Sequence, residues 1–213
     1  MTGTADEVSY MPTVRAFVAI DPGARLREWV GGALGRLAQR YRTVRWVRPE
    51  SIHLTLRFLG DIETPQVADI LGALESSCAA EPVPEALESV CLDLGESGSF
   101  GRRSAPTVCW IGLRPSPSVE YVCRLQYVLE RAVRRLGFEA ERRRWTPHLT
   151  LGRNRSREDL AGWEPCVGLV DGDAPSMMVE EIGLYSSELW PSGAKYNRLG
   201  EVRLQRRREV RPN

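Results

Sequence analysis

Two histidines are the residues of this chain best suited to acid–base chemistry near neutral pH. His53 and His148 are the only histidines among the 213 residues, and each is followed by Leu-Thr-Leu. Imidazole is the side chain whose charge changes most readily between about pH 5 and pH 8. The duplicated His-x-Thr pattern therefore indicates a site that uses two imidazoles rather than two unrelated packing residues.

The His-x-Thr spacing suits a β-strand, because alternate side chains of a strand point to the same face. His53 and Thr55 would share one face of a first strand, and His148 and Thr150 one face of a second. The buried face of the first strand would consist of Ile52, Leu54, Leu56 and Phe58. Two such strands facing each other would present a proton donor and a proton acceptor, with a hydroxyl beside each.

This pairing matches in-line displacement at phosphorus, in which the attacking oxygen loses a proton and the leaving oxygen gains one. The two threonine hydroxyls and Arg153 would hold the non-bridging phosphate oxygens. Strict strand alternation turns Arg153 away from His148, so this role requires a bend or bulge near Gly152. The design needs no metal. A metal enzyme is disfavoured because the histidines have no neighbouring cluster of carboxylates or cysteines.

The elements that must position these residues follow from apolar spacing and turn signals. Amphipathic helices are predicted from Leu26 to about Tyr41, over 67–78 and over 119–136, the last with Gly137 as its C-cap. A short helix is predicted over 157–163. Strands are predicted over 15–20, 52–59, around 90–94, over 107–113, from His148, over 179–186 and over 196–204. Thr64 is expected to cap the second helix, with Pro65 in its first turn. The glycine- and serine-rich segment 95–101 is predicted to be an irregular loop.

Each half of the chain runs through strands and a long helix to an aromatic- and proline-containing approach to a His-x-Thr strand. This similarity indicates an internal duplication. We therefore expect an α+β protein of two pseudo-symmetric lobes, with mostly antiparallel sheets facing a central cleft and helices on the outside. The expected organisation is a flexible N-terminal tail over 1–12, a single bilobal domain over 13–205 and a basic C-terminal tail over 206–213.

Composition narrows the possible classes of protein. The net charge is only +1, so the overall electrostatic field of the protein gives no reason to expect non-specific binding along nucleic acid. All but one of the basic residues are arginine, which suits phosphate but is explained equally well by genomic base composition. Five cysteines without a C-x-x-C pair predict buried thiols in a reducing compartment. No apolar run reaches membrane-spanning length and no signal peptide is recognised, so a cytoplasmic location is expected. The protein is also expected to be a monomer.

The two motifs and their surroundings resemble the 2H phosphoesterases. The similarity narrows to the RNA 2′,3′-cyclic phosphodiesterase branch, also called the 2′-5′ RNA ligase family, over residues 15–20, 46–60 and 147–153. It extends from about Arg15 to Leu204, nearly the whole chain. One His-x-Thr is a weak signal, whereas two with this flanking sequence are specific.

The resemblance implies a bilobal 2H phosphoesterase-like fold with both motifs lining a central groove. It implies cofactor-free, metal-independent hydrolysis of the 2′,3′-cyclic phosphate of RNA ends or cyclic nucleotides to a 2′-phosphomonoester. By position, His53 would be the proton donor to the leaving 3′ oxygen and His148 the proton acceptor that activates water. Thr55 and Thr150 would bind phosphate oxygens, and Arg153 matches the arginine after the second motif. The residues alone leave the acid and base assignments open.

Other residues have both a structural and a functional interpretation. The resemblance implies that Phe17 stacks a base, although a strand phenylalanine is usually part of the core. Tyr196 lies where the family often has an aromatic residue. Arg57 would share the face of His53 and bind substrate, or simply be solvated. The run Arg142–Arg144 would be a solvated face or guide RNA phosphates, and Trp46 and Trp145 would pack beneath the motifs.

The sequence is also compatible with three alternatives to cyclic-phosphate hydrolysis. The same site could join RNA ends through a 2′-5′ linkage or cut 2′-5′ oligonucleotides. The groove could also hold RNA ends without cleaving them. Hydrolysis is favoured over ligation because the sequence has no P-loop and no evident nucleotide-activating lysine.

Overall fold

The protein is described by a computed structural model over residues 12–102, 105–154, 174–190 and 193–206. Residues 1–11, the helix predicted over 157–163 and the basic tail from 207 onward lie outside the described residues. The described residues form three long helices, α1 (Gly23–Arg40), α2 (Gln66–Ala80) and α3 (Pro117–Arg135), and one 3₁₀ turn, η1 (Pro49–Ser51). The strands are β1 (Thr13–Ile20), β2 (Val44–Trp46), β3 (Leu54–Glu63), β4 (Cys91–Leu92), β5 (Leu94–Arg102), β6 (Ala105–Leu113), β7 (His148–Asn154), β8 (Met177–Met178), β9 (Glu181–Trp190) and β10 (Gly193–Arg203).

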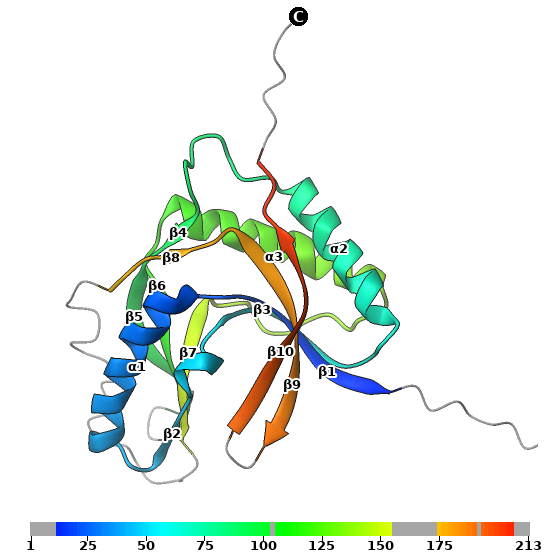
Figure 1. Cartoon of the computed structure of the whole chain (residues 1–213). Coiled ribbons are helices and arrows are strands. Elements are labelled where there is room, and N and C mark those ends of the chain that lie inside the picture. Colours follow the sequence, from blue (N-terminus) through cyan, green and yellow to red (C-terminus); the bar gives the residue numbers. More distant parts are fainter. Residues whose placement is uncertain (1–11, 103–104, 155–173, 191–192, 207–213) are drawn as a thin grey trace, which may run out of the picture.

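Most strands belong to one antiparallel sheet of order β10-β9-β1-β3-β7-β6-β5, with β2 paired to the outer part of β7. The connection at the centre of this sheet is slight, because β3 and β7 pair only through Leu54 and Leu149. In Figure 1, β1, β9 and β10 lie to one side of this junction, and β5, β6 and β7 lie to the other. The α+β class is confirmed. The two parts of the sheet on either side of this junction, called half-sheets below, are connected through the β3–β7 pair into one hydrogen-bonded sheet.

The helices cover the sheet and complete its core. Figure 1 shows α2 and α3 lying alongside each other on the side of β10, and α1 on the side of β2 and β7. The buried face of α3 follows helical spacing through Tyr121, Val122, Leu125, Leu129 and Val133. These side chains join those of both half-sheets in a single hydrophobic cluster. The motif strands are therefore fixed from behind by one continuous core.

Local signals explain several element boundaries. The hydroxyl of Ser116 accepts a hydrogen bond from the backbone N–H of Val119 and caps α3, and Pro117 follows in the first turn. Gly137 adopts a positive φ of 93° just beyond the helix, as predicted for its C-cap. The predicted cap at Thr64 is wrong, because α2 has no side-chain cap. The hydroxyl of Thr64 donates instead to the carbonyl of Pro12.

The prediction of an irregular loop over 95–101 is also wrong. This segment belongs to β5 and pairs with β6. Glycine is required here by packing, since a Cβ on Gly98 would lie 2.3 Å from the Trp110 ring. The strand is therefore stabilised by its partner and by an aromatic ring that fills the space a side chain would occupy.

The remaining expectations concern the C-terminal end and the thiols. Arg206, assigned to the basic tail, is held to the body of the protein by hydrogen bonds to the carbonyls of Leu87 and Glu88. The described cysteines, Cys78, Cys91, Cys109 and Cys123, are free thiols. Among the described residues, no helix is long and apolar enough to cross a membrane.

Candidate active site

The two histidines meet at the centre of the sheet. His53 immediately precedes β3, and His148 is the first residue of β7. The only β3–β7 residue pair, Leu54 with Leu149, joins the positions that follow the two histidines. Because these leucines are fully buried, alternation places His53, Thr55, His148 and Thr150 on the opposite face of the sheet. The structure thus brings the four predicted residues together about a local twofold relation.

Each imidazole is oriented by the same backbone contact. Nδ1 of His53 lies 2.9 Å from the carbonyl oxygen of Ser51, and Nδ1 of His148 lies 2.7 Å from that of Thr146. A carbonyl can only accept, so Nδ1 carries the proton in both rings. The Nε2 atoms are consequently the groups that can take or give a proton. In both motifs, the backbone carbonyl two residues before the histidine therefore selects the Nδ1–H tautomer.

The surroundings of both histidines disfavour the imidazolium form. Burial lowers the pKa of His53 from 6.5 to about 4, against the opposing hydrogen bond to Ser51, and the charge of His148 lowers it further. Burial also lowers the pKa of His148, with Arg153 adding to the effect. Both rings are therefore neutral at pH 7 in the ligand-free protein. A bound anion beside them would stabilise the protonated form.

A β-bulge occurs at the same position of both motifs. The register of β1 with β3 skips Leu56, and the register of β6 with β7 skips Leu151. Each of these leucines is the third residue after its histidine, and each is buried. A bulge changes which face the following residues occupy. The bulge predicted near Gly152 is thus present one residue earlier, and its counterpart in β3 was not anticipated.

The bulge explains the position of Arg153. This side chain is exposed and lines the same cavity as Tyr196, and its charge lowers the pKa of His148. The equivalent position in β3 is Phe58, which is 57% exposed and lies with its ring centroid 6.0 Å from that of Phe17. The prediction that Phe58 faces the core is wrong for the same reason. One half of the site therefore has a cation where the other half has an aromatic ring.

Arg57 does not share the face of His53. The bulge at Leu56 turns its guanidinium to the opposite side, where it forms an ion pair of 2.7 Å with Glu130 of α3 and a hydrogen bond to the carbonyl of Glu139. Glu141 lies 3.7 Å from the same guanidinium. Since Arg57 is also buried, the expectation that it is either a substrate ligand or a solvated residue is wrong. It connects β3 to α3.

Aromatic rings enclose His53. The Phe17 ring centroid lies 4.8 Å from that of His53, and the Tyr196 ring lies edge-on at 5.1 Å. Phe17 is only 3% exposed and also contacts Tyr185 and Tyr196. The ring of Phe17 thus supports His53 and leaves almost no surface to stack a base. Tyr196 is half-buried and reaches both His53 and the neighbouring cavity.

Sequence reasoning missed the aromatic residues around His148. Phe100 lies edge-on to the imidazole at 4.9 Å, and Trp110 lies at 6.0 Å. Phe100 belongs to the segment that was expected to be a loop. Phe100 lies two residues after Gly98, and Gly98 pairs with Trp110 of the opposing strand. This alternation is the signal that could have predicted a strand with Phe100 near His148. The two histidines are therefore both lined by aromatic rings, although from different strands.

Two hydrogen bonds connect the approach to each motif with the strand of the other. Nε1–H of Trp145 donates to the carbonyl of Thr55 at 2.9 Å. The backbone N–H of Val47 donates to the carbonyl of Leu151 at 2.9 Å. Trp145 is half-buried against the core, as predicted, but its indole N–H also fixes the two motifs relative to each other. Arg142, Arg143 and Arg144 are exposed.

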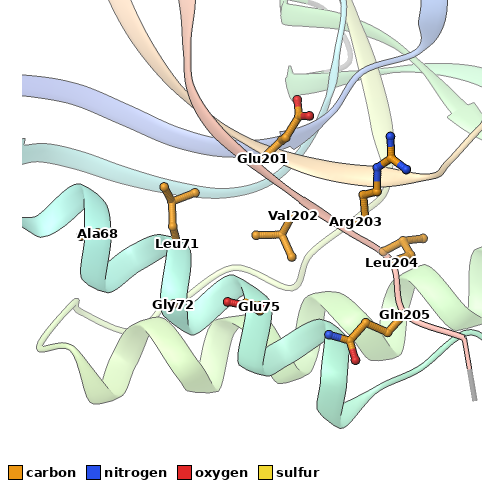
Figure 2. A pocket seen from close by; sticks show the side chains of 9 residues that line it. All are labelled: Ala68, Leu71, Gly72, Glu75, Glu201, Val202, Arg203, Leu204 and Gln205. Atoms are coloured by element: carbon orange, nitrogen blue, oxygen red, sulfur yellow. The ribbon is translucent and has the colours of Figure 1, made fainter.

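The larger described cavity is remote from this chemistry. It measures about 550 Å³ and is lined by Leu71 and Glu75 of α2 and by residues 201–205 at the end of β10. Figure 2 shows that its walls come from these two segments. It contains neither histidine nor motif threonine. Among the described residues, no group of three or more His, Cys, Asp or Glu side chains is arranged to hold a metal ion.

Comparisons with known proteins agree with this geometry. The family model "LigT like Phosphoesterase" matches residues 26–110 and again 112–196, once over each half. An RNA 2′,3′-cyclic phosphodiesterase of Methanothermobacter thermautotrophicus is 31% identical, over 90% of this chain and 99% of that protein. One from Thermotoga maritima is 27% identical, over 90% and 96%. The crystal structure of E. coli LigT with 3′-AMP superposes with a TM-score of 0.66 at 25% identity, covering 92% and 100%.

Proposed function

The chain belongs to the LigT-like phosphoesterase family, and on this premise we propose that it is an RNA 2′,3′-cyclic phosphodiesterase. The observation that carries the proposal is the pair of imidazoles on one face of the sheet, each held in the Nδ1–H tautomer by a backbone carbonyl. The curated relatives named above are RNA 2′,3′-cyclic phosphodiesterases. The reaction is hydrolysis of a terminal 2′,3′-cyclic phosphate to a 2′-phosphomonoester.

The proposed reaction uses the two Nε2 atoms in opposite senses. Neutral His148 accepts a proton from water as the water oxygen bonds to phosphorus. The bond from phosphorus to the 3′ oxygen breaks, and protonated His53 donates its Nε2 proton to that oxygen. Burial and the charge of Arg153 lower the pKa of His148 and keep it neutral, as a base requires. Because the pKa of His53 is lowered as well, the assignment of acceptor to His148 and donor to His53 follows the family resemblance. Exchange of protons with solvent restores the starting forms.

His53 requires the substrate for its role as the acid. Burial holds the pKa of the free imidazole at about 4, so the ring is neutral at pH 7 before substrate binds. The negative charge of the cyclic phosphate stabilises the imidazolium and raises this pKa. Thr55, Thr150 and Arg153 would hold the non-bridging oxygens, whose charge increases during attack. Tyr196 would contact the nucleoside beside His53.

Product analysis tests this function. A short RNA ending in a 2′,3′-cyclic phosphate is incubated with the protein, and the ends are resolved as 2′-phosphate, 3′-phosphate or unchanged. The proposal predicts the 2′-phosphate, formed equally with and without a chelator. Unchanged RNA would favour an end-binding module, and loss of activity with the chelator would indicate a metal enzyme.

A further inference from the structure

A second cavity adjoins the histidines. It has a volume of about 330 Å³, and its lining includes Arg153 and Tyr196. One wall comes from β2, η1 and Arg153 of β7, and the other from the β9–β10 hairpin. Arg153 and Tyr196 belong both to this cavity and to the surroundings of the histidines. A ligand that occupies the histidine site can therefore continue directly into this cavity.

The cavity is strongly basic. Its described lining contains Arg45, Arg48 and Arg153 and no acidic side chain. The β2–β7 register places Arg45 directly opposite Arg153. Arg45 Nη2 and Arg48 Nε converge on Gly193, lying 3.6 Å and 3.8 Å from where its Cβ would be. The planar guanidinium group matches the geometry of phosphate, so three of them on one small cavity favour a phosphate group there.

The rim of the cavity is aromatic and apolar. Trp190 is 54% exposed and Leu189 is 79% exposed at the end of β9, and both line the cavity. The Trp190 indole N–H donates to Glu188, which fixes the ring at the mouth. An exposed indole next to arginines is the combination that stacks nucleobases along a bound RNA backbone.

We propose that this cavity is a subsite for the RNA chain on the 5′ side of the terminal nucleotide. The inference rests on the proposed function and specifies its substrate class. A 2′,3′-cyclic phosphate ends the chain, so the only route onward from the terminal nucleoside is through its 5′ oxygen. The 5′ phosphate binds Arg45 and Arg48, next to the cyclic phosphate held by Arg153, and the preceding base stacks on Trp190. The substrates are thus RNA oligonucleotide ends in preference to cyclic mononucleotides.

Three substrates with the same terminal base separate the contributions. They are adenosine 2′,3′-cyclic phosphate, the same compound with a 5′-phosphate, and the dinucleotide ApA ending in a 2′,3′-cyclic phosphate. For the wild type we expect the 5′-phosphate to raise kcat/KM by about tenfold or more, because charge-assisted hydrogen bonds form. The second base should add a further gain of about fivefold or more by stacking. Equal kcat/KM for the three substrates would overturn the proposal.

Variants assign each gain to its residues. The double variant Arg45→Ala/Arg48→Ala should reduce the gain from the 5′-phosphate to nearly none, and Trp190→Ala should remove only the gain from the second base. The matched control Arg36→Ala/Arg135→Ala removes two exposed charges from α1 and α3 and should preserve both gains. Thermal melting of every variant checks folding. If the control removes the gains as fully as the cavity variant does, net charge rather than the subsite is responsible.

A binding measurement tests the subsite without turnover. Calorimetry compares adenosine 2′-phosphate with adenosine 2′,5′-bisphosphate, and we expect the second to bind the wild type about tenfold more tightly. Equal Kd values would overturn the subsite even if hydrolysis is observed. Tighter binding of the bisphosphate by a protein that hydrolyses none of the cyclic substrates would support the subsite and overturn the proposed function.

Discussion

At the scale of single residues, the site depends on how two chemically identical side chains are made different. Both imidazoles donate Nδ1–H to a carbonyl two residues upstream. Their surroundings differ: His53 lies among Phe17 and Tyr196, whereas His148 is influenced by the charge of Arg153. The two nearly identical motifs therefore orient both imidazoles in the same way, while different neighbouring side chains surround each ring.

The pKa shifts predict an acidic pH optimum for kcat/KM. The reactive free enzyme holds one proton on the histidine pair, and both pKa values lie below 6.5 because burial disfavours the charged ring. As pH rises above 6.5 this form becomes rarer, so kcat/KM should fall about tenfold per pH unit. The kcat profile should lie at higher pH, since bound phosphate raises both pKa values.

Nuclear magnetic resonance can measure these pKa values directly, because the chain has only two histidines. His53 should titrate near pH 4 in the free protein, and both midpoints should rise when 2′-AMP is added. Each ring should show the Nδ1–H tautomer. A His53 midpoint at or above 6.5 in the free protein would contradict the account.

Arg57 provides a test of stability rather than of substrate binding. Arg57→Met leaves the partly buried carboxylate of Glu130 without its 2.7 Å partner, which should lower the free energy of unfolding by about 3–5 kcal/mol. KM for a cyclic phosphate should change little, because Arg57 faces α3. The double variant Arg57→Met/Glu130→Leu should recover much of the lost stability, as measured by denaturant unfolding. A large rise in KM with normal stability would instead show that Arg57 binds substrate.

At the scale of the elements, the paired bulges are the main determinant of the site. Leu56 and Leu151 are each the extra residue of their strand, and each stays in the core. Without the second bulge, Arg153 would point away from His148. Without the first, Arg57 would lie beside His53 and Phe58 in the core. The same device in both halves thus produces a cation on one side and an aromatic ring on the other.

Gly98 connects β5 to the surroundings of His148. Gly98→Ala places a methyl group against the Trp110 ring, which should destabilise the protein by about 1–3 kcal/mol through overpacking. Activity should fall because Trp110 contacts His148. The control Gly35→Ala, on α1 with nothing within 4 Å of the added Cβ, should stabilise by about 0.5–1 kcal/mol. Equal effects of the two substitutions on melting would contradict this packing.

Trp145 is expected to act as a positioning residue. Trp145→Phe removes the hydrogen bond to the carbonyl of Thr55 while keeping an aromatic ring in the core. We expect kcat to fall about ten- to a hundredfold, because small displacements of reacting groups are costly, with KM nearly unchanged. Trp29→Phe on α1 serves as the matched control and should alter only stability. An unchanged kcat for Trp145→Phe would show that the indole N–H has no such role.

The sequence predicted the elements whose signals are local. The spacing of α3, its Gly137 cap and the parity of His53 with Thr55 are all confirmed in the structure. Features that depend on partners were missed. The strand through Gly98 requires Trp110, and the position of Arg57 requires both a bulge and Glu130. Alternation alone predicts a regular strand, so it fails at the residues that follow each bulge.

At the scale of the whole molecule, two similar halves build one site at their junction. The family model matches each half separately, and the half-sheets meet through Leu54 and Leu149. The hydrogen bonds of Trp145 and Val47 cross this junction in opposite directions. Each half contributes one histidine and one threonine, so neither half alone contains the acid and base pair. Although the net charge is only +1, the described lining of the cavity beside the histidines has three arginines and no acidic side chain.

The most direct test of the two-histidine account is single-turnover hydrolysis of an RNA 2′,3′-cyclic end by His53→Ala, His148→Ala and the double variant. Each single variant should melt as a folded protein and lose about 100- to 10,000-fold in rate. The double variant should lose little more than either single variant, since the two groups act as one unit. Full activity in either folded single variant would contradict the account.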